Sequence, residues 1–91
     1  MSAIAIGRVC VKIAGKDASK YCVITDVADG SYVEITGPKA LNGVKRRKCN
    51  ISHIEPTSDI VKIKAKASDE DVLKAVESAK LSDKMKAGLN L

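Results

Sequence analysis

The segment from Gly7 to Val27, GRVCVKIAGKDASKYCVITDV, decides the fold. It holds two runs rich in β-branched residues, Val9–Ile13 and Cys22–Val27, joined by a link of small and charged residues, Ala14–Lys20. Each run has the length and composition of a β-strand, and the link is too long for a two-residue turn. We therefore predict a β-hairpin whose loop carries cations outward.

Residues of two kinds alternate along the first of these strands. The two sets are Val9, Val11 and Ile13 on one side and Arg8, Cys10 and Lys12 on the other. A period of two predicts that the apolar set is buried and that the other set faces water or a partner. Gly7 lies within this pattern, where a glycine indicates a bulge or a close backbone approach that bends the strand into a small barrel.

Turn signals divide the next part of the chain. Asp29-Gly30 separates the second strand, Tyr21–Val27, from a third apolar run, Tyr32–Ile35, and predicts an antiparallel hairpin. Gly37-Pro38 then interrupts regular structure, because proline lacks an amide donor and restricts the residue before it.

A strongly basic run follows. Asn42-Gly43 predicts a turn, and the segment after it, Lys45–Lys48, predicts a fourth strand with charge on both faces, as suits an edge strand that lies on RNA. Residues 51–56 predict a short last strand or turn that Pro56 stops. Five short strands with a turn about every ten residues favour a small barrel over a parallel sheet.

The remainder of the chain changes character. Residues 60–66 form an alternating basic connector, and Ser68 is placed to cap a helix that begins with three acids, Asp69–Asp71. The apolar stripe expected to pack on the barrel consists of Val72, Ala75, Val76 and Ala79. Ser82-Asp83 is placed to cap a last short turn that ends at Gly88.

The length and charge of the chain limit the classes of function that we expect. A chain of 91 residues predicts one domain with a core too thin to enclose a deep catalytic cavity comfortably. The net charge of +5 favours a polyanion as partner, and the presence of only two Tyr, with no Phe or Trp, argues against stacking of many unpaired bases. Folded nucleic acid with an exposed phosphate backbone fits better.

The three cysteines point to a reducing compartment. They cannot all pair within the chain, and the first six residues lack the features of a signal peptide. No run has the apolar length of a membrane span, so we expect a soluble cytoplasmic protein.

A metal centre and a catalytic site are both disfavoured. Cys10, Cys22, Cys49 and His53 could supply four zinc ligands, but no Cys-x-x-Cys pair is present. A nucleophile and an orienting carboxylate are not evident beside His53, so a packed or RNA-facing imidazole is expected. Gly15-Lys16 lacks the spaced glycines of a phosphate-binding Walker loop. We predict no cofactor, no metal, no catalytic residues and no small-molecule substrate.

The sequence resembles a known family. Ile6-Gly7-Arg8-Val9 through Val23-Ile24, with Gly15-Lys16-Asp17 between them, is similar to the KOW motif of ribosomal proteins and transcription elongation factors. The continuation resembles one subfamily, the eukaryote-type fourteenth protein of the large ribosomal subunit, in its archaeal form. The residues that carry this second resemblance are Thr36-Gly37-Pro38-Lys39, Leu41, Gly43-Val44, Arg46-Arg47, Asn50-Ile51, His53, Glu55, Pro56 and Asp71-Val72-Leu73-Lys74-Ala75-Val76.

The resemblance implies an SH3-like five-stranded barrel, mainly β, with a C-terminal α-helical appendage. We expect the barrel in residues 1–57 and the basic connector with the helix in residues 58–91. The implied role is that of a structural constituent of the large ribosomal subunit that binds ribosomal RNA and neighbouring ribosomal proteins. One residue departs from the family pattern, because Ser19 stands where the loop usually has a second glycine. Either Ser19 accepts a strained positive φ or the loop takes another path.

The RNA-binding residues are expected among the cations of strands and loops. They are Arg8, Lys12, Lys16, Lys20, Lys39, Lys45, Arg46, Arg47 and Lys48, with Arg46 and Arg47 as first choices. Structural turns are expected at Gly7, Gly15, Gly37 and Gly43. A polar hairpin loop, a charged edge that discourages aggregation and a localisation signal are the simpler explanations of the same cations. The alternative function is a KOW-type protein-interaction module of a transcription or translation factor.

Overall fold

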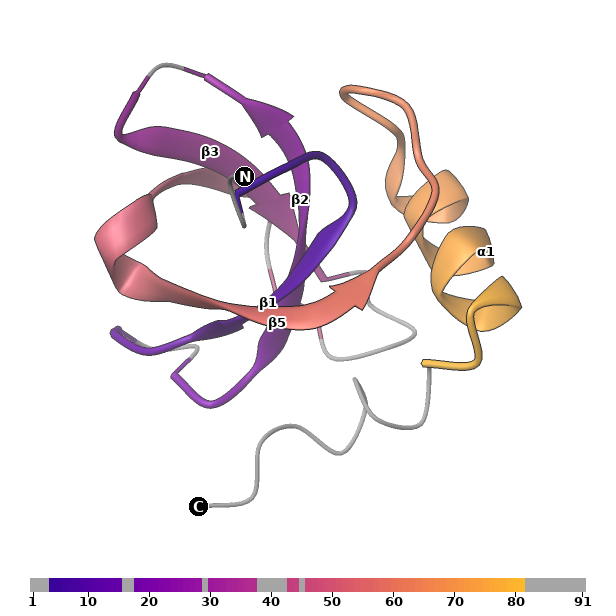
Figure 1. The fold of residues 1–91 in the computed structure, drawn as a ribbon, viewed down its shortest axis with the longest axis horizontal. Coiled ribbons are helices and arrows are strands. Elements are labelled where there is room, and N and C mark those ends of the chain that lie inside the picture. The colour runs from indigo at the N-terminus through magenta and orange to yellow at the C-terminus, as the bar shows by residue number, and fades with distance from the viewer. Residues whose placement is uncertain (1–3, 16–17, 29, 38–42, 45, 82–91) are drawn as a thin grey trace.

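A computed structural model describes residues 4–15, 18–28, 30–37, 43–44 and 46–81. Within these residues, an antiparallel sheet, a short 3-10 helix and one α-helix follow one another along the chain (Figure 1). The elements are β1 (Arg8–Lys12), β2 (Tyr21–Val27), β3 (Tyr32–Thr36), β4 (Arg47–Asn50), η1 (Ile51–His53), β5 (Ile54–Ile60) and α1 (Asp69–Ser78). The mainly β fold with a helix after the sheet is therefore confirmed.

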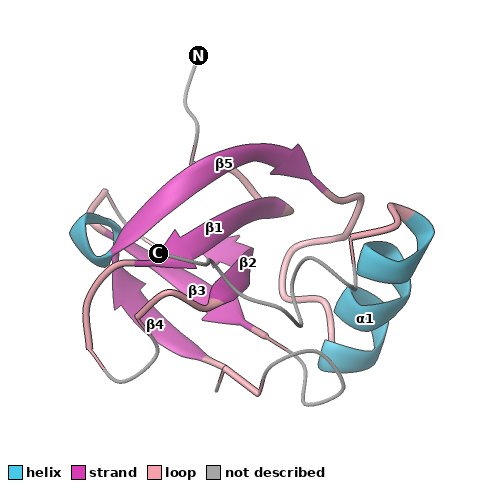
Figure 2. Cartoon of the chain, turned by 90° about the horizontal axis from the view of Figure 1, so that it is seen from below, coloured by secondary structure: helices cyan, strands magenta, loops and turns pink. Residues whose placement is uncertain are grey.

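The sheet is curled but not closed. Its strand order is β4-β3-β2-β1-β5, so β4 and β5 are its two edges, although η1 joins them directly in the chain (Figure 2). Two backbone hydrogen bonds connect η1 to the residues beside β3 and β1. One runs from Ile51 N–H to the Ser31 carbonyl (3.0 Å) and the other from Ile13 N–H to the His53 carbonyl (2.9 Å). The predicted barrel is thus a five-stranded sheet with an open seam between β4 and the β1–β5 pair.

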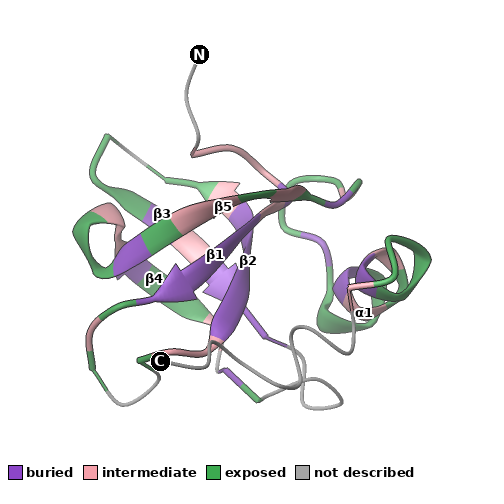
Figure 3. Ribbon diagram, turned by 60° about the horizontal axis from the view of Figure 1, so that its bottom comes forward, coloured by how far each residue is buried: buried purple, intermediate pink, exposed green. Residues whose placement is uncertain are grey.

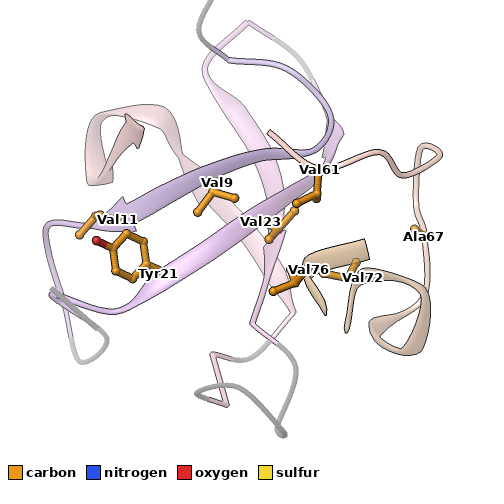
Figure 4. Packing of buried hydrophobic residues seen from close by; sticks show 8 residues of the cluster. All are labelled: Val9, Val11, Tyr21, Val23, Val61, Ala67, Val72 and Val76. Carbon is orange, nitrogen blue, oxygen red and sulfur yellow. The ribbon is translucent and has the colours of Figure 1, made fainter. Parts of the chain in front are cut away.

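Two hydrophobic clusters lie on opposite faces of β1 and β2. One contains Cys10, Cys22 and Ile24 with residues of β3, β4 and β5, and fills the inside of the curl. The other contains Val9 and Val23 and packs against Val72 and Val76 of α1 (Figure 4). The middle of the sheet is consequently buried from both sides (Figure 3).

Burial on both faces corrects the expectation for β1. Cys10 and Lys12, which were predicted to face water or a partner, are 0% and 4% exposed, whereas Ile13, predicted to be buried, is 54% exposed. The period-two pattern was right about which residues share a face. It was wrong about which face is exposed to solvent, because α1 covers the Val9 face and the curl of the sheet covers the Cys10 face.

The last strand is longer than predicted. Of the predicted strand or turn at residues 51–56, residues 51–53 form the helical turn η1, and β5 begins at Ile54 and continues through Pro56 to Ile60. Pro56 pairs with Cys10 of β1, and β5 is an edge strand. An edge strand tolerates proline, because the missing N–H group can face away from the neighbouring strand. The expectation that Pro56 stops the strand was therefore wrong.

Gly7 is required by a close approach of two backbones, as predicted. Its φ is +91°, and a Cβ there would collide with the carbonyl oxygen of Val61. Gly7 N–H donates to the Ile24 carbonyl at 2.8 Å, and the Gly7 carbonyl accepts from Val61 N–H at 2.8 Å. This residue thus joins β2 to the start of the connector, and the β1–β5 register shifts just after it.

The loop after β1 turns at Ser19. Ser19 has a φ of 77°, and its N–H donates to the Lys12 carbonyl at 2.8 Å. The first of the two alternatives for this loop is therefore the right one, and Ser19 accepts the strained conformation. Gly15 and Gly43 also have positive φ, and Gly37 is buried and donates its N–H to the Val44 carbonyl. Asn42 lies outside the described residues.

The helix begins where the sequence predicts. Ser68 caps α1 by accepting a hydrogen bond from Asp71 N–H, and three acids occupy the first turn. Val72 and Val76 are buried, but Ala79, expected in the same stripe, is exposed and lies just after the helix. The predicted turn from Ser82 to Gly88 lies outside the described residues.

Candidate nucleic-acid interface

A basic hollow lies at the open seam of the sheet. It has a volume of about 420 Å³ and lies between the end of β1, the edge strand β4 and η1. We call it the seam hollow, and its lining residues are Lys12, Ala14, Gly15, Tyr32, Arg47, Lys48, Cys49, Asn50 and His53. No carboxylate is among these lining residues, whereas Lys12, Arg47 and Lys48 each contribute a positive charge.

Lys12 is the buried cation of the seam hollow. It is 4% exposed, and its Nζ donates to Cys49 Sγ at 3.5 Å. An ammonium group has three N–H donors, and a thiol sulfur is a weak acceptor. The structure therefore places a poorly compensated positive charge at the edge of the core, where an anion would satisfy it.

The remaining basic side chains of the lining come from β4 and η1. Arg47 and Lys48 are exposed on the edge strand, in register with Ile35 and Glu34 of β3. His53, also exposed, ends η1. Asn50 begins η1, because its Oδ1 accepts a hydrogen bond from Ser52 N–H at 2.9 Å. The direct β4–η1–β5 connection thus brings these side chains to one place.

Tyr32 adds an aromatic ring to the lining. It is 43% exposed and in register with Asn50, whereas the other tyrosine, Tyr21, is 6% exposed in the core. Sequence reasoning missed Tyr32 and Asn50 as site residues. Alternation along β3, with Val33 and Ile35 inward, is the signal that would have placed Tyr32 outward. Asn50 gave no such signal, because residues 51–56 were interpreted as a strand or turn and the cap was not recognised.

Other predicted site residues lie away from the seam hollow. Arg8 is half-buried, and its Nη1 donates to the Thr57 carbonyl at 3.1 Å, which ties β1 to β5. Lys20 is half-buried and is not among the lining residues. Lys16, Lys39 and Lys45 lie outside the described residues. The structure thus brings together Lys12, Arg47 and Lys48 of the predicted set.

Arg46 is held in an intramolecular network. Its Nη1 lies 2.7 Å from Glu34 Oε1, and its Nη2 lies 2.8 Å from Asp69 Oδ1 and also donates to the Ala67 carbonyl. Thr36 Oγ1 donates to the same Asp69 oxygen at 2.8 Å. These contacts fasten the start of α1 to β3, so we call Arg46, Glu34 and Asp69 the helix clamp.

The electrostatics of the helix clamp match its geometry. The hydrogen bond from Thr25 to Glu34 Oε1, at 2.8 Å, and those from Arg46 lower the pKa of Glu34. Burial opposes the charged form of Arg46, but its hydrogen bonds to Asp69 and Glu34 outweigh this and raise its pKa. The Arg46 guanidinium is therefore committed to carboxylates of its own chain.

The described residues offer no ready metal centre. Within them no three His, Cys, Asp or Glu side chains gather as ligands, and Cys10, Cys22 and Cys49 are buried free thiols. Burial raises the pKa of Cys10 to about 12, which disfavours the thiolate that a metal would need.

A larger groove lies on another side of the molecule. It has a volume of about 820 Å³ between the connector and α1, with Ile60, Ile63 and Ala75 among its apolar residues and Lys62 and Lys64 among its charged ones. Figures 1 and 2 both show η1 and α1 at opposite sides of the sheet, so the seam hollow and the groove lie on different sides of the molecule. Among the described helices, none is long and apolar enough to cross a membrane.

Comparison with known proteins identifies the family. No family model matches the chain. A large ribosomal subunit protein eL14 from Staphylothermus marinus is 54% identical over 86 residues, which cover 94% of this chain and 90% of the relative. Proteins of the same name from Saccharolobus islandicus (48% identical over 91 residues, 100% and 95% covered) and Pyrobaculum arsenaticum (58% over 83 residues, 91% and 81% covered) are similar throughout. The chain belongs to the family of large ribosomal subunit proteins eL14.

Proposed function

We propose that this protein is a structural constituent of the large ribosomal subunit in the cytoplasm and binds ribosomal RNA through the seam hollow. The observation that carries the proposal is the convergence of Lys12, Arg47 and Lys48 on one hollow without a carboxylate in its lining. The names of the relatives support a place in the large subunit, and a structural role needs no catalytic residues.

The physical basis is neutralisation of phosphate. Cations that approach the RNA backbone release condensed counterions, which supplies affinity that does not depend on sequence. Arg47 has a planar guanidinium suited to two parallel hydrogen bonds with phosphate, and Lys48 acts as a mobile point charge beside it. Lys16, Lys39 and Lys45 remain proposed RNA contacts, and Lys16 directly follows Gly15 of the lining.

Arg46 leaves the group of first-choice RNA ligands in this proposal. Its guanidinium already binds two carboxylates and a carbonyl group, so phosphate contact would require breaking the helix clamp. We assign Arg46 a structural role and Arg47 the phosphate contact.

The salt dependence of RNA binding tests the proposal. The double variant R47A/K48A should reduce the slope of log affinity against log salt for ribosomal RNA by about 1 to 2, because each lost phosphate contact removes roughly 0.7 to 0.9 of slope. The matched control K62A/K64A removes the same charge from exposed residues of the groove and should change the slope less. Filter binding over a salt series measures both. Equal slopes for R47A/K48A and the unaltered protein would contradict the proposal.

The groove beside α1 favours an additional contact with a neighbouring protein. Its exposed Ile60 and half-buried Ile63 would bury apolar surface, which RNA backbone cannot do as well. A protein-interaction module without RNA binding is the alternative function. Co-sedimentation with large ribosomal subunits at high salt, set against recovery of polymerase from the same extract, separates the two.

A further inference from the structure

We propose that the seam hollow holds a single nucleotide extruded from folded RNA, with its phosphate toward Lys12, Arg47 and Lys48 and its base against Tyr32. This inference rests on the proposed function and specifies the RNA feature that the site recognises. It also revises the expectation from composition, which favoured an intact backbone surface over unpaired bases.

The first argument is shape. A regular RNA helix presents its phosphates along a ridge, and cations on a flat or convex surface are enough to contact them. The seam hollow is instead an open concavity of about 420 Å³, a volume comparable to that of small-ligand pockets. A duplex would touch only its rim, whereas one nucleotide that leaves the helix could enter it.

The second argument is the buried ammonium group of Lys12. Lys12 is more than nine-tenths buried and lines the hollow, and within the described residues its Nζ donates a hydrogen bond to the Cys49 sulfur at 3.5 Å. An ammonium group that is shielded from water and bonded to a weak acceptor gains more from a nearby anion than an ammonium group surrounded by water does. Because Lys12 lies deeper than the exposed Arg47 and Lys48, we infer that its ligand is an anionic group that enters the hollow.

The third argument is the ring beside these cations. Tyr32 is the exposed one of the two tyrosines, and it lies in register with Asn50, so both belong to the same edge of the hollow. Asn50 Oδ1 accepts a hydrogen bond from Ser52 N–H, and the NH₂ group of this lining residue supplies two donors. Stacking on an aromatic face together with a nearby amide is the way proteins hold an unstacked RNA base.

The test compares two hairpin RNAs that differ by one unpaired adenosine in the stem. The bulged RNA should bind about tenfold more tightly than the fully paired one at equal salt, as expected for one stacked base. Tyr32→Ala should remove this preference without changing the salt slope, and Tyr32→Phe should keep it. Lys12→Met, a substitution of similar size that suits a buried site, should weaken binding of the bulged RNA more than binding of the paired one, with folding checked by thermal melting.

The outcomes separate this inference from the proposed function. A salt-dependent affinity that is equal for bulged and paired RNA, or a bulge preference that survives Tyr32→Ala, overturns the inference and leaves the proposed function standing. Absence of binding to either hairpin and to ribosomal RNA overturns both. Adenosine monophosphate serves as a second probe, with Tyr32 followed by nuclear magnetic resonance. Binding as tight as that of the bulged RNA would assign the hollow to free nucleotides and overturn the RNA assignment.

Discussion

Ser19 has a backbone conformation that glycine adopts at lower cost. Its φ of 77° places it in the left-handed region, and the hydrogen bond from its N–H to the Lys12 carbonyl holds it there. A side chain in that region costs about 1 to 2 kcal/mol, while glycine loses roughly 0.5 to 1 kcal/mol more backbone entropy on folding. Ser19→Gly should therefore raise the free energy of unfolding by about 0.5 to 1 kcal/mol, measured by urea denaturation.

The same loop supplies the control for this prediction. Ala18 is exposed and is not among the residues with positive φ, so Ala18→Gly gains no relief of strain. That variant should be slightly less stable than the unaltered protein. If both glycine variants were destabilised alike, the conformation of Ser19 would carry no strain.

Arg46 and Arg47 are neighbours in the chain with opposite expected roles. Arg46→Ala removes the hydrogen bonds that join Glu34 and Asp69 and should lower the free energy of unfolding by about 1 to 3 kcal/mol. Arg47→Ala changes an exposed edge residue and should change the free energy of unfolding by less than about 0.5 kcal/mol in either direction. Urea denaturation of the two variants measures the difference, and equal effects would contradict the division of roles.

At the scale of elements, the helix clamp makes the attachment of α1 depend on pH. The pKa of Glu34 is lowered in the folded protein by Thr25 and Arg46, so its ionised form stabilises the fold above the ordinary glutamate pKa. This contribution is lost as the pH falls through the lowered value. Glu34 is one-third exposed, so the effect is small, below about 1 kcal/mol.

Glu34→Gln isolates this contribution from that of other carboxylates. At pH 7 the variant should be less stable than the unaltered protein. The difference should shrink as the pH falls below about 4.5, where Glu34 of the unfolded chain takes up a proton, and should vanish once the pH passes the lowered pKa of Glu34 in the folded protein. Urea denaturation at a series of pH values gives the comparison. A difference that stays constant down to pH 3 would show that hydrogen-bond geometry alone, and not charge, is responsible.

Most of the strands and the helix α1 could be predicted from local patterns, but η1, the extent of β5 and the burial of side chains could not. The bounds of β2 and the cap at Ser68 follow from composition and spacing. The burial of Lys12 depends on the curl of the sheet, which brings it next to Cys49, 37 residues away in the chain. Arg46 could not be separated from Arg47 for the same reason, since Asp69 lies 23 residues further along. Long-range contacts of this kind leave no period in the sequence.

At the scale of the whole molecule, the distribution of charge favours binding over stability. The net charge is +5, and the seam hollow collects Lys12, Arg47 and Lys48 without a carboxylate among its lining residues. Like charges held close together repel one another in the folded state and separate on unfolding. A surface built to receive phosphate should therefore reduce the stability of the free protein.

The double variant R47A/K48A tests this cost as well as RNA binding. At low salt the free energy of unfolding of this variant should be as high as that of the unaltered protein or higher, by up to about 0.5 kcal/mol. The reason is that repulsion between positive charges around Lys12 is relieved. The gain should vanish near 1 M NaCl, where charges are screened beyond about 3 Å. K62A/K64A should gain less, since those lysines share their groove with Asp71. A loss of more than about 1 kcal/mol in R47A/K48A at low salt would mean that Arg47 and Lys48 hold the fold together, and their weaker RNA binding would then reflect partial unfolding.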